Sequence, residues 1–178
     1  MNRSHAFELT IPLGTTDHSI GPANALVTVA EYGDFECPNC KQAAPAVKLL
    51  LRHFKGRIRF AFRHFPLEEV HPHALHAAEA AESAGGQGKF WPMHDLLFEN
   101  QPHLKLPQLR SYAEQLELDL TRYTAEMQDQ VYLQRIREHI QSGRDSGVRA
   151  TPTFFVNRHI QDVSFGLDSL FKAVESAL

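Results

Sequence analysis

Residues 27–40 read VTVAEYGDFECPNC and place a cysteine pair directly after a strand pattern. Residues 25–32 are rich in β-branched and aromatic side chains and are followed by a glycine, which predicts a buried strand. After the cysteines, apolar residues recur at helical spacing until Gly56. Pro38 suits the first turn of a helix, where its missing N–H is no loss. We therefore expect a strand that leads into a helix beginning at the cysteines.

The rest of the chain continues this alternation of strands and helices. Apolar residues at every second position predict another strand from Ile58 until Pro66. Residues 66–150 have little strand character and are interpreted as four or five helices. Thr153–Val156 predicts a strand, Ile160–Val163 predicts its antiparallel return, and a final amphipathic helix starts near residue 167. The sequence is therefore typical of an α/β protein.

Two residues give local signals inside the helical stretch. Asp119 is a candidate N-cap, because its carboxylate can accept a hydrogen bond from an unpaired N–H of the first turn. Gly147 lies where a glycine can end a helix.

Length and charge exclude several classes of protein. The chain has 178 residues, with 18 basic and 21 acidic side chains and a net charge of −3. No global positive field favours nucleic acid or an anionic membrane surface, so neither is expected as a partner. No stretch approaches the roughly 18 apolar residues of a spanning helix, and residues 1–21 lack the apolar core of a signal peptide. We expect a soluble, cytoplasmic protein.

The two cysteines, Cys37 and Cys40, are the most informative part of the composition. A disulfide between them closes a very small loop and adds little stability, so a purely structural bridge is not expected. A pair with this spacing more often carries out redox chemistry or binds a metal.

The start of a helix gives the first cysteine a chemical role. Unpaired N–H groups and about half a unit of positive charge favour an anion there. The thiolate of Cys37 is therefore favoured, and a thiolate is the species that attacks disulfides. Cys40 lies one turn further along and can displace a mixed disulfide. Pro38 and Asn39, between the sulfurs, tune the redox equilibrium.

Three segments resemble the DsbA-like branch of the thioredoxin superfamily: residues 27–40, Phe62–Leu67 (FRHFPL) and Thr151–Asn157 (TPTFFVN). The resemblance covers the chain from about residue 17 onward. It implies a thioredoxin fold, with a central mixed sheet flanked by helices and an inserted helical domain. The expected domains are a thioredoxin-like domain of residues 1–65 and 151–178, and a helical insertion of residues 66–150.

The resemblance also implies roles for individual residues. Cys37 is expected as the exposed nucleophile and Cys40 as the resolving thiol. Pro152 resembles the family's cis-proline, and Thr151 precedes it. The resemblance implies that this cis-proline faces the cysteine pair and binds an extended peptide. Glu31 resembles a buried acid whose raised pKa lets it relay a proton to or from Cys40.

These roles imply a protein disulfide oxidoreductase that exchanges disulfides with protein or peptide thiols. No cofactor is expected beyond the redox-active Cys37–Cys40 disulfide, and a separate redox partner recycles the pair.

The sequence leaves two other functions open. One is a metal-binding or thiol-buffer module that uses the same cysteine pair, with histidines from the cluster His71, His73 and His76 as further ligands. Zinc usually requires four ligands, and the sequence has no second Cys-x-x-Cys, so no metal ligand is assigned. The other is a non-redox interaction protein with a thioredoxin shape.

Simpler interpretations also exist for the other residues. Glu31 can be an ion-paired or exposed strand acid, and Thr151-Pro152 can be a strand entry. The basic residues are interpreted as a solvated face, and the aromatic residues as core. The basic set is Lys48, Arg52, Lys55, Arg57, Arg59 and Arg63, and the aromatic set is Phe90, Trp91 and Phe98.

Overall fold

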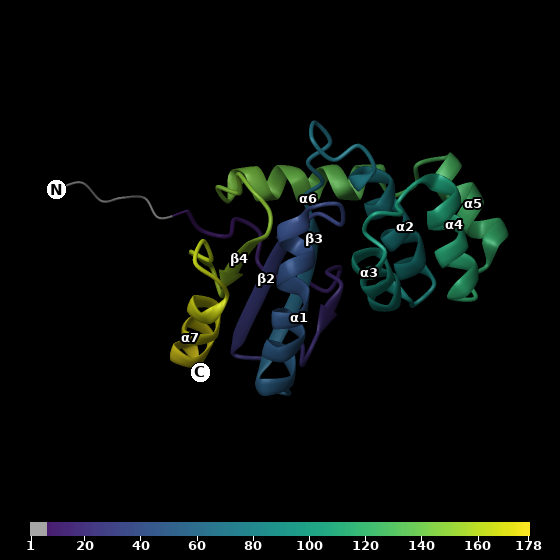
Figure 1. Cartoon of the computed structure of the whole chain (residues 1–178). Coiled ribbons are helices and arrows are strands. Elements are labelled where there is room, and N and C mark those ends of the chain that lie inside the picture. The colour runs from purple at the N-terminus through teal and green to yellow at the C-terminus, as the bar shows by residue number, and fades with distance from the viewer. Residues whose placement is uncertain (1–6) are drawn as a thin grey trace. The chain divides into compact units, whose positions relative to one another are not determined.

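The computed structural model describes residues 7–178 and contains the predicted order of strands and helices, preceded by a short strand at residues 19–20 that was not predicted (Figure 1). The elements are β1 (Ser19–Ile20), β2 (Val27–Gly33), α1 (Pro38–His53), β3 (Ile58–His64), α2 (Ala74–Gly86), α3 (Phe90–Glu99), α4 (Leu106–Gln115), α5 (Leu120–Gln128), α6 (Leu133–Asp145), β4 (Thr153–Val156), β5 (His159–Gln161) and α7 (Asp168–Ala177).

The strands form one mixed five-stranded sheet in the order β1-β3-β2-β4-β5. β2 and β4 are antiparallel, with Glu31 opposite Phe154. β2 is buried along nearly its whole length, since it lies inside the sheet and α7 packs against it. This explains the almost continuous run of β-branched and aromatic residues in β2. The sheet and its helices form a thioredoxin fold, which confirms the predicted fold class.

A two-residue turn joins β4 to β5, as the sequence predicted. Val156 pairs with His159, so Asn157 and Arg158 form the loop. Asn157 has a φ of 53°, a conformation that asparagine tolerates better than most residues. Its side-chain oxygen accepts a hydrogen bond from the Thr28 N–H at 2.9 Å. The return strand ends at Gln161, two residues earlier than predicted.

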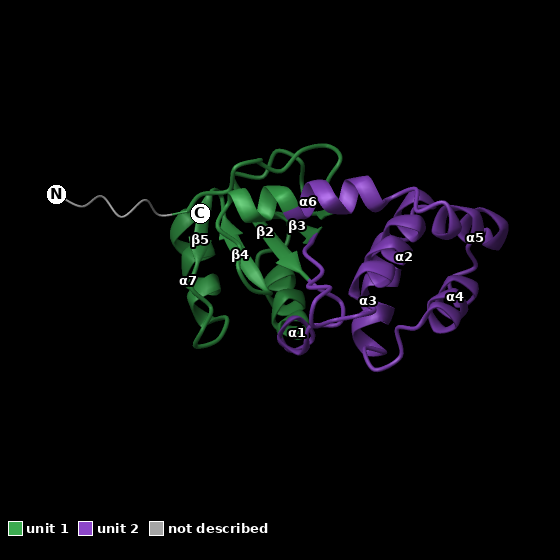
Figure 2. Ribbon diagram, turned by 90° about the horizontal axis from the view of Figure 1, so that it is seen from above, with its two compact units in different colours: residues 1–33, 43–63, 141–178 green, residues 34–42, 64–140 purple. Residues whose placement is uncertain are grey.

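The chain divides into two compact units (Figure 2). Unit 1 comprises residues 1–33, 43–63 and 141–178, and unit 2 comprises residues 34–42 and 64–140. This division differs from the predicted domains in three respects. The main stretch of the second unit begins at residue 64 rather than 66 and ends at residue 140 rather than 150, and the unit also includes the cysteine segment 34–42.

Unit 2 is built around the alanine-rich helix α2, which packs against α3, α4 and α5. The buried alanines of α2 have small side chains, which allow close approach of the neighbouring helices. Asp119 caps α5 as predicted, because its side chain accepts a hydrogen bond from the Arg122 N–H at 3.0 Å. The glycine after α6 is also confirmed, since Gly147 has a φ of 86° two residues beyond the helix end.

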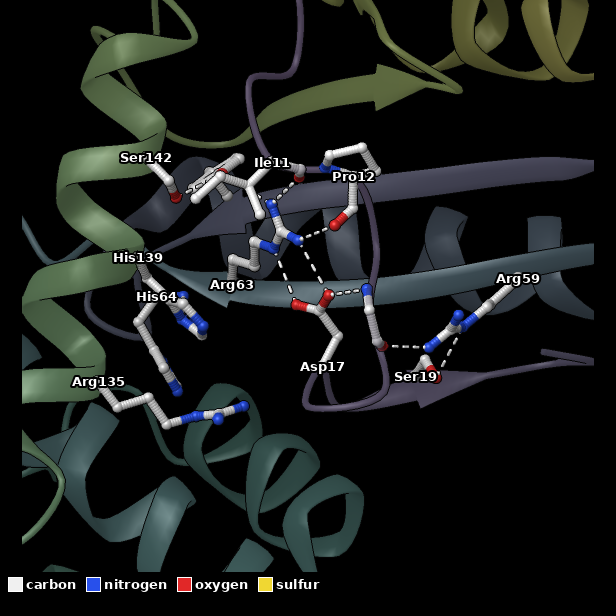
Figure 3. A network of polar contacts seen from close by, with 12 residues as sticks. Ile11, Pro12, Asp17, Ser19, Arg59, Arg63, His64, Arg135, His139 and Ser142 are labelled. Atoms are coloured by element: carbon white, nitrogen blue, oxygen red, sulfur yellow. Dashed lines mark hydrogen bonds and ion pairs between the residues drawn. The ribbon is translucent and has the colours of Figure 1, made fainter.

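The arginines of β3 do not form a solvated face, and this corrects the sequence interpretation. Arg63 is only 3% exposed, and its Nε and Nη2 donate to the two carboxylate oxygens of Asp17 at 2.8 and 2.9 Å (Figure 3). Its other hydrogens reach the carbonyls of Ile11 and Pro12 and the Tyr32 hydroxyl. All five N–H groups of the guanidinium are thus used.

Arg59 is also buried, with bonds to the Ser19 hydroxyl and the Gly14 carbonyl. The segment before β1 therefore covers this face of β3 and satisfies both guanidinium groups. The other four basic residues of the set are exposed: Lys48, Arg52, Lys55 and Arg57.

Candidate active site at the cysteine pair

Cys37 lies immediately before the first residue of α1. β2 ends at Gly33, and the chain turns so that the Cys37 N–H donates to the Asp34 carbonyl at 3.1 Å. α1 begins at Pro38, which occupies the first turn as predicted. The Cys37 carbonyl accepts the Lys41 N–H at 3.2 Å, a bond of helical spacing. The first sulfur therefore belongs to the residue at the N-terminus of α1, where unpaired N–H groups favour an anion.

Both cysteines are buried. Cys37 is 5% exposed and Cys40 is 0% exposed, whereas Pro38 and Asn39 between them are exposed. The expectation of an exposed Cys37 is therefore wrong. Cys37 is buried although it lies at the start of α1, because hydrogen bonds hold residues 34–37 against the rest of unit 2. The small accessible fraction still belongs to Cys37 and not to Cys40.

The Asp34 carboxylate ties the cysteine segment to the loop before α2. One oxygen accepts the Glu36 N–H at 2.8 Å. The other accepts the Leu67 N–H at 2.9 Å and pairs with His71 Nδ1 at 2.7 Å. The Asp34 side chain is fully buried.

Glu36 makes a second connection to the same loop. Its carboxylate accepts the His73 N–H at 2.7 Å. The sequence analysis missed Asp34 and Glu36, although an acid following a strand and another beside the cysteine were visible signals.

Gln101 holds the cysteine segment from the end of α3. Its side-chain Nε2 donates to the Phe35 carbonyl at 2.8 Å and to the Cys37 carbonyl at 2.9 Å. No pattern in the sequence links this residue to the cysteines, and it was not predicted.

Phe35 fills the space between the cysteine segment and the helices of unit 2. Its ring centroid lies 5.0 Å from that of Phe98, 5.7 Å from His94 and 5.9 Å from His64. The core role predicted for Phe90 and Phe98 is confirmed, whereas Trp91 is only half-buried.

A buried ion-pair group also lies in unit 2. His64 Nε2 is 2.8 Å from one oxygen of Glu82, and Arg135 Nε is 2.9 Å from the other. Both carboxylate oxygens of the buried Glu82 therefore have a polar partner within the helical unit.

The three histidines at the start of α2, His71, His73 and His76, are not assembled around one point. His71 pairs with Asp34, and His76 Nδ1 lies 3.1 Å from a carboxylate oxygen of Glu79. His73 occupies the N-cap position of α2. Within residues 7–178, no three His, Cys, Asp or Glu side chains are arranged to hold a metal ion.

Glu31 is buried in β2, at 3% exposure, so its predicted burial is confirmed and an exposed strand acid is excluded. Its role as a proton relay stays a prediction. The Thr151–Pro152 peptide bond is cis, and Thr151 is buried. The strand β4 begins at the next residue, Thr153.

The model of the family described as Thioredoxin matches residues 14–176. The chain belongs to the thioredoxin family. Among solved structures, this thioredoxin-family protein is similar to oxidised BdbD from Bacillus subtilis, with a TM-score of 0.84 and 22% identity, covering 93% of this chain and 95% of the other. It is also similar to DsbA2 from Pseudomonas aeruginosa, with a TM-score of 0.74 and 24% identity, covering 94% and 97%. These matches identify the fold as DsbA-like.

The curated relatives have a different name. A protein named Na(+)/H(+) antiporter NhaA 1, from Salinispora arenicola, is 49% identical over 171 residues, which are 96% of this chain and 26% of that protein. A protein of the same name from Mycobacterium sp. (strain KMS) is 35% identical over 90% of this chain and 26% of its own length. The thioredoxin-family chain thus spans about a quarter of the curated relatives it matches.

The expectation of a cytoplasmic location is wrong, because the DsbA-like proteins with matching structures are periplasmic. The expectation rested on the absence of an apolar segment in residues 1–21, and the start of this sequence does not determine the compartment. Among the helices of residues 7–178, none has the length and apolar character needed to cross a membrane.

Proposed function

We propose that this protein is a thiol–disulfide oxidoreductase that acts on protein or peptide thiols, with Cys37 as nucleophile and Cys40 as resolving thiol. The main support is the position of Cys37 directly before α1, in a chain of the thioredoxin family with a DsbA-like fold. The difference in burial, 5% for Cys37 against 0% for Cys40, favours the same assignment of roles.

The proposed exchange moves two electrons and conserves every sulfur. The Cys37 thiolate attacks one sulfur of a substrate disulfide, and the other substrate sulfur leaves as a thiolate. The Cys40 thiolate then attacks the Cys37 sulfur, which releases the reduced substrate and leaves a Cys37–Cys40 disulfide. Substrate oxidation is the same sequence in reverse. A separate redox partner restores the starting state of the pair.

Five other residues have supporting roles in this proposal. Pro38 and Asn39 are exposed between the sulfurs, so their side chains contact an incoming substrate and tune the redox equilibrium. Thr151 and Pro152 bind an extended substrate peptide through their backbone. Glu31 accepts or returns the Cys40 proton, and its side chain is buried in β2.

The antiporter activity in the relatives' names is not proposed for this segment. The matched region is 26% of the Salinispora arenicola protein, and that region corresponds to the thioredoxin-family chain. Thiol exchange is the function that we propose for this chain.

The decisive experiment equilibrates the protein with glutathione buffers of graded redox ratio at pH 7 and counts free thiols by alkylation and mass. We expect the pair to convert between dithiol and disulfide. Cys37→Ser should abolish exchange with a disulfide-containing peptide, whereas Cys40→Ser should accumulate a mixed disulfide at Cys37. Full exchange by Cys37→Ser, or tight zinc binding that blocks alkylation, contradicts the proposal.

The Glu31 role has its own test. Glu31→Gln keeps the size of the side chain and removes its proton-relay capacity. We expect slower resolution of the mixed disulfide and an unchanged initial attack by Cys37, measured by stopped flow. Equal rates for both steps in the variant and the wild type discard the relay.

A further inference from the structure

Gln101 reaches the backbone of the cysteine segment at two places. Its single side-chain nitrogen, Nε2, lies 2.8 Å from the Phe35 carbonyl oxygen and 2.9 Å from the Cys37 carbonyl oxygen. An amide NH₂ has two hydrogens, so each carbonyl receives one of them. The two carbonyls must therefore point toward the same nitrogen, which restricts the backbone between residues 35 and 37.

The second carbonyl is also part of α1. The Cys37 carbonyl accepts the Lys41 N–H at 3.2 Å in addition to the Gln101 bond. The bond to Gln101 thus acts on the same peptide group that opens the helix. A rotation of this peptide group would move both the Cys37 side chain and the first N–H groups of α1.

Gln101 itself lies in an ordered turn. α3 ends at Glu99, and the next residue, Asn100, bonds to the Leu96 carbonyl through both its backbone N–H and its side-chain Nδ2, each at 2.9 Å. The His103 N–H donates to the Asn100 carbonyl at 2.7 Å. The Phe98 ring, one turn earlier in α3, packs against Phe35. The base of the Gln101 side chain is therefore fixed by its own unit.

We propose that Gln101 is a positioning residue for Cys37, which holds the peptide groups of residues 35 and 37 so that the N–H groups at the start of α1 stay directed at the Cys37 sulfur. This inference rests on the proposed function, because the sulfur needs that orientation only if it reacts as a thiolate. Two neutral hydrogen bonds gain little more than the rotamer entropy that an immobilised glutamine loses. Gln101 therefore affects the sulfur more than the stability of the fold.

The test variant is Gln101→Met, which keeps the length of the side chain and removes both donors. We expect the measured pKa of the Cys37 thiol, from thiolate absorbance in ultraviolet light, to rise by about half a unit to one unit. At a pH one unit below the wild-type pKa, the alkylation rate of Cys37 should fall about three- to tenfold. The melting temperature should change little. The matched control is Gln87→Met, in the same unit, whose amide bonds to the backbone of Asp119 instead.

Three outcomes overturn the inference. The first is an unchanged Cys37 pKa and alkylation rate in folded Gln101→Met, and the second is an equal change in Gln87→Met. If Gln101→Met does not fold, the inference is tested on the wild-type protein instead. Scalar couplings across the hydrogen bonds, from Gln101 Nε2 to the carbonyl carbons of residues 35 and 37, must then be observed, and their absence is the third outcome.

The same measurements separate this inference from the proposed function. Thiol pKa values and alkylation rates need no substrate, so Gln101 can pass its test in a protein that exchanges no disulfide with glutathione. Conversely, the wild type can exchange disulfides while Gln101→Met keeps the wild-type pKa and alkylation rate of Cys37. That result rejects only the inference.

Discussion

Replacing Arg63 with methionine should strongly destabilise the protein, because the guanidinium is buried and fully used. Its five N–H groups are bonded to Asp17, two carbonyls and the Tyr32 hydroxyl, and both Arg63 and Asp17 are at most 5% exposed. Burial alone lowers the pKa of Arg63, but the hydrogen bonds to Asp17 and Tyr32 and the electrostatic interactions with the same two residues raise it above its ordinary value. The side chain therefore stays charged at every working pH.

The size of the effect follows from the loss of one partner in a buried ion pair. Such a loss costs about 3–5 kcal/mol, because the remaining charge keeps its desolvation penalty without the attraction. In a protein of 150–250 residues, each kcal/mol shifts the melting temperature by about 2–4 °C, so we expect Arg63→Met to melt about 6–20 °C lower.

Guanidinium chloride titration, followed by far-ultraviolet circular dichroism, measures this free energy of unfolding. The matched control is Arg158→Met, since Arg158 is 57% exposed and lies 3.7 Å from Glu8, which is also half exposed. A surface pair of this kind contributes less than about 1 kcal/mol. The double variant Asp17→Asn with Arg63→Met should recover part of the loss, because the uncompensated carboxylate is gone. A loss of less than about 1 kcal/mol in Arg63→Met would falsify the reasoning.

Three further changes test other parts of the structure. In Asp34→Asn an NH₂ group replaces one carboxylate oxygen, and the single oxygen left cannot serve all three contacts of Asp34. We therefore expect a loss of about 1–3 kcal/mol in the free energy of unfolding, measured by guanidinium titration; an unchanged midpoint contradicts this role of Asp34. Gly33→Ala places a methyl group 2.4 Å from the Phe62 ring and should lower the free energy of unfolding by about 1–3 kcal/mol; a stability equal to wild type shows that the ring moves freely. Burial raises the pKa of Glu79 against the opposing effect of His76. A raised carboxyl pKa in the folded state means that the side chain's contribution to stability is greatest at low pH and is lost as the pH rises through the folded pKa. Glu79→Gln should therefore be more stable than wild type at pH 7 and similar to it at pH 4, and equal stability at both values rejects this.

Most of the architecture could be predicted because its signals are local. β-branched and aromatic runs marked β2 and β4, helical spacing marked α1, and Pro38 marked its first turn within one residue. A side-chain cap such as Asp119 and a glycine such as Gly147 act within a few residues of the chain, so they too are visible in the sequence.

The features that were missed depend on contacts between distant segments. Arg63 looked like a surface residue because its partner Asp17 is 46 residues away. Gln101 is 64 residues from Cys37, and no spacing rule links a glutamine after one helix to the carbonyls before another. The burial of Cys37 has the same origin, because long-range contacts hold its segment. The expected compartment was wrong for another reason, since the first residues of the given sequence carry no information about where the folded domain works.

The membership of residues 34–42 in the helical unit has a consequence for how such proteins diverge. The sulfur-bearing turn has hydrogen-bond partners in the insertion, at positions 67, 71, 73 and 101. Exchanging or remodelling the insertion therefore offers a way to alter the reactivity of the thiols while every residue from the first sulfur to the second stays the same. Homologues with an identical Cys-Pro-Asn-Cys motif need not share a reduction potential.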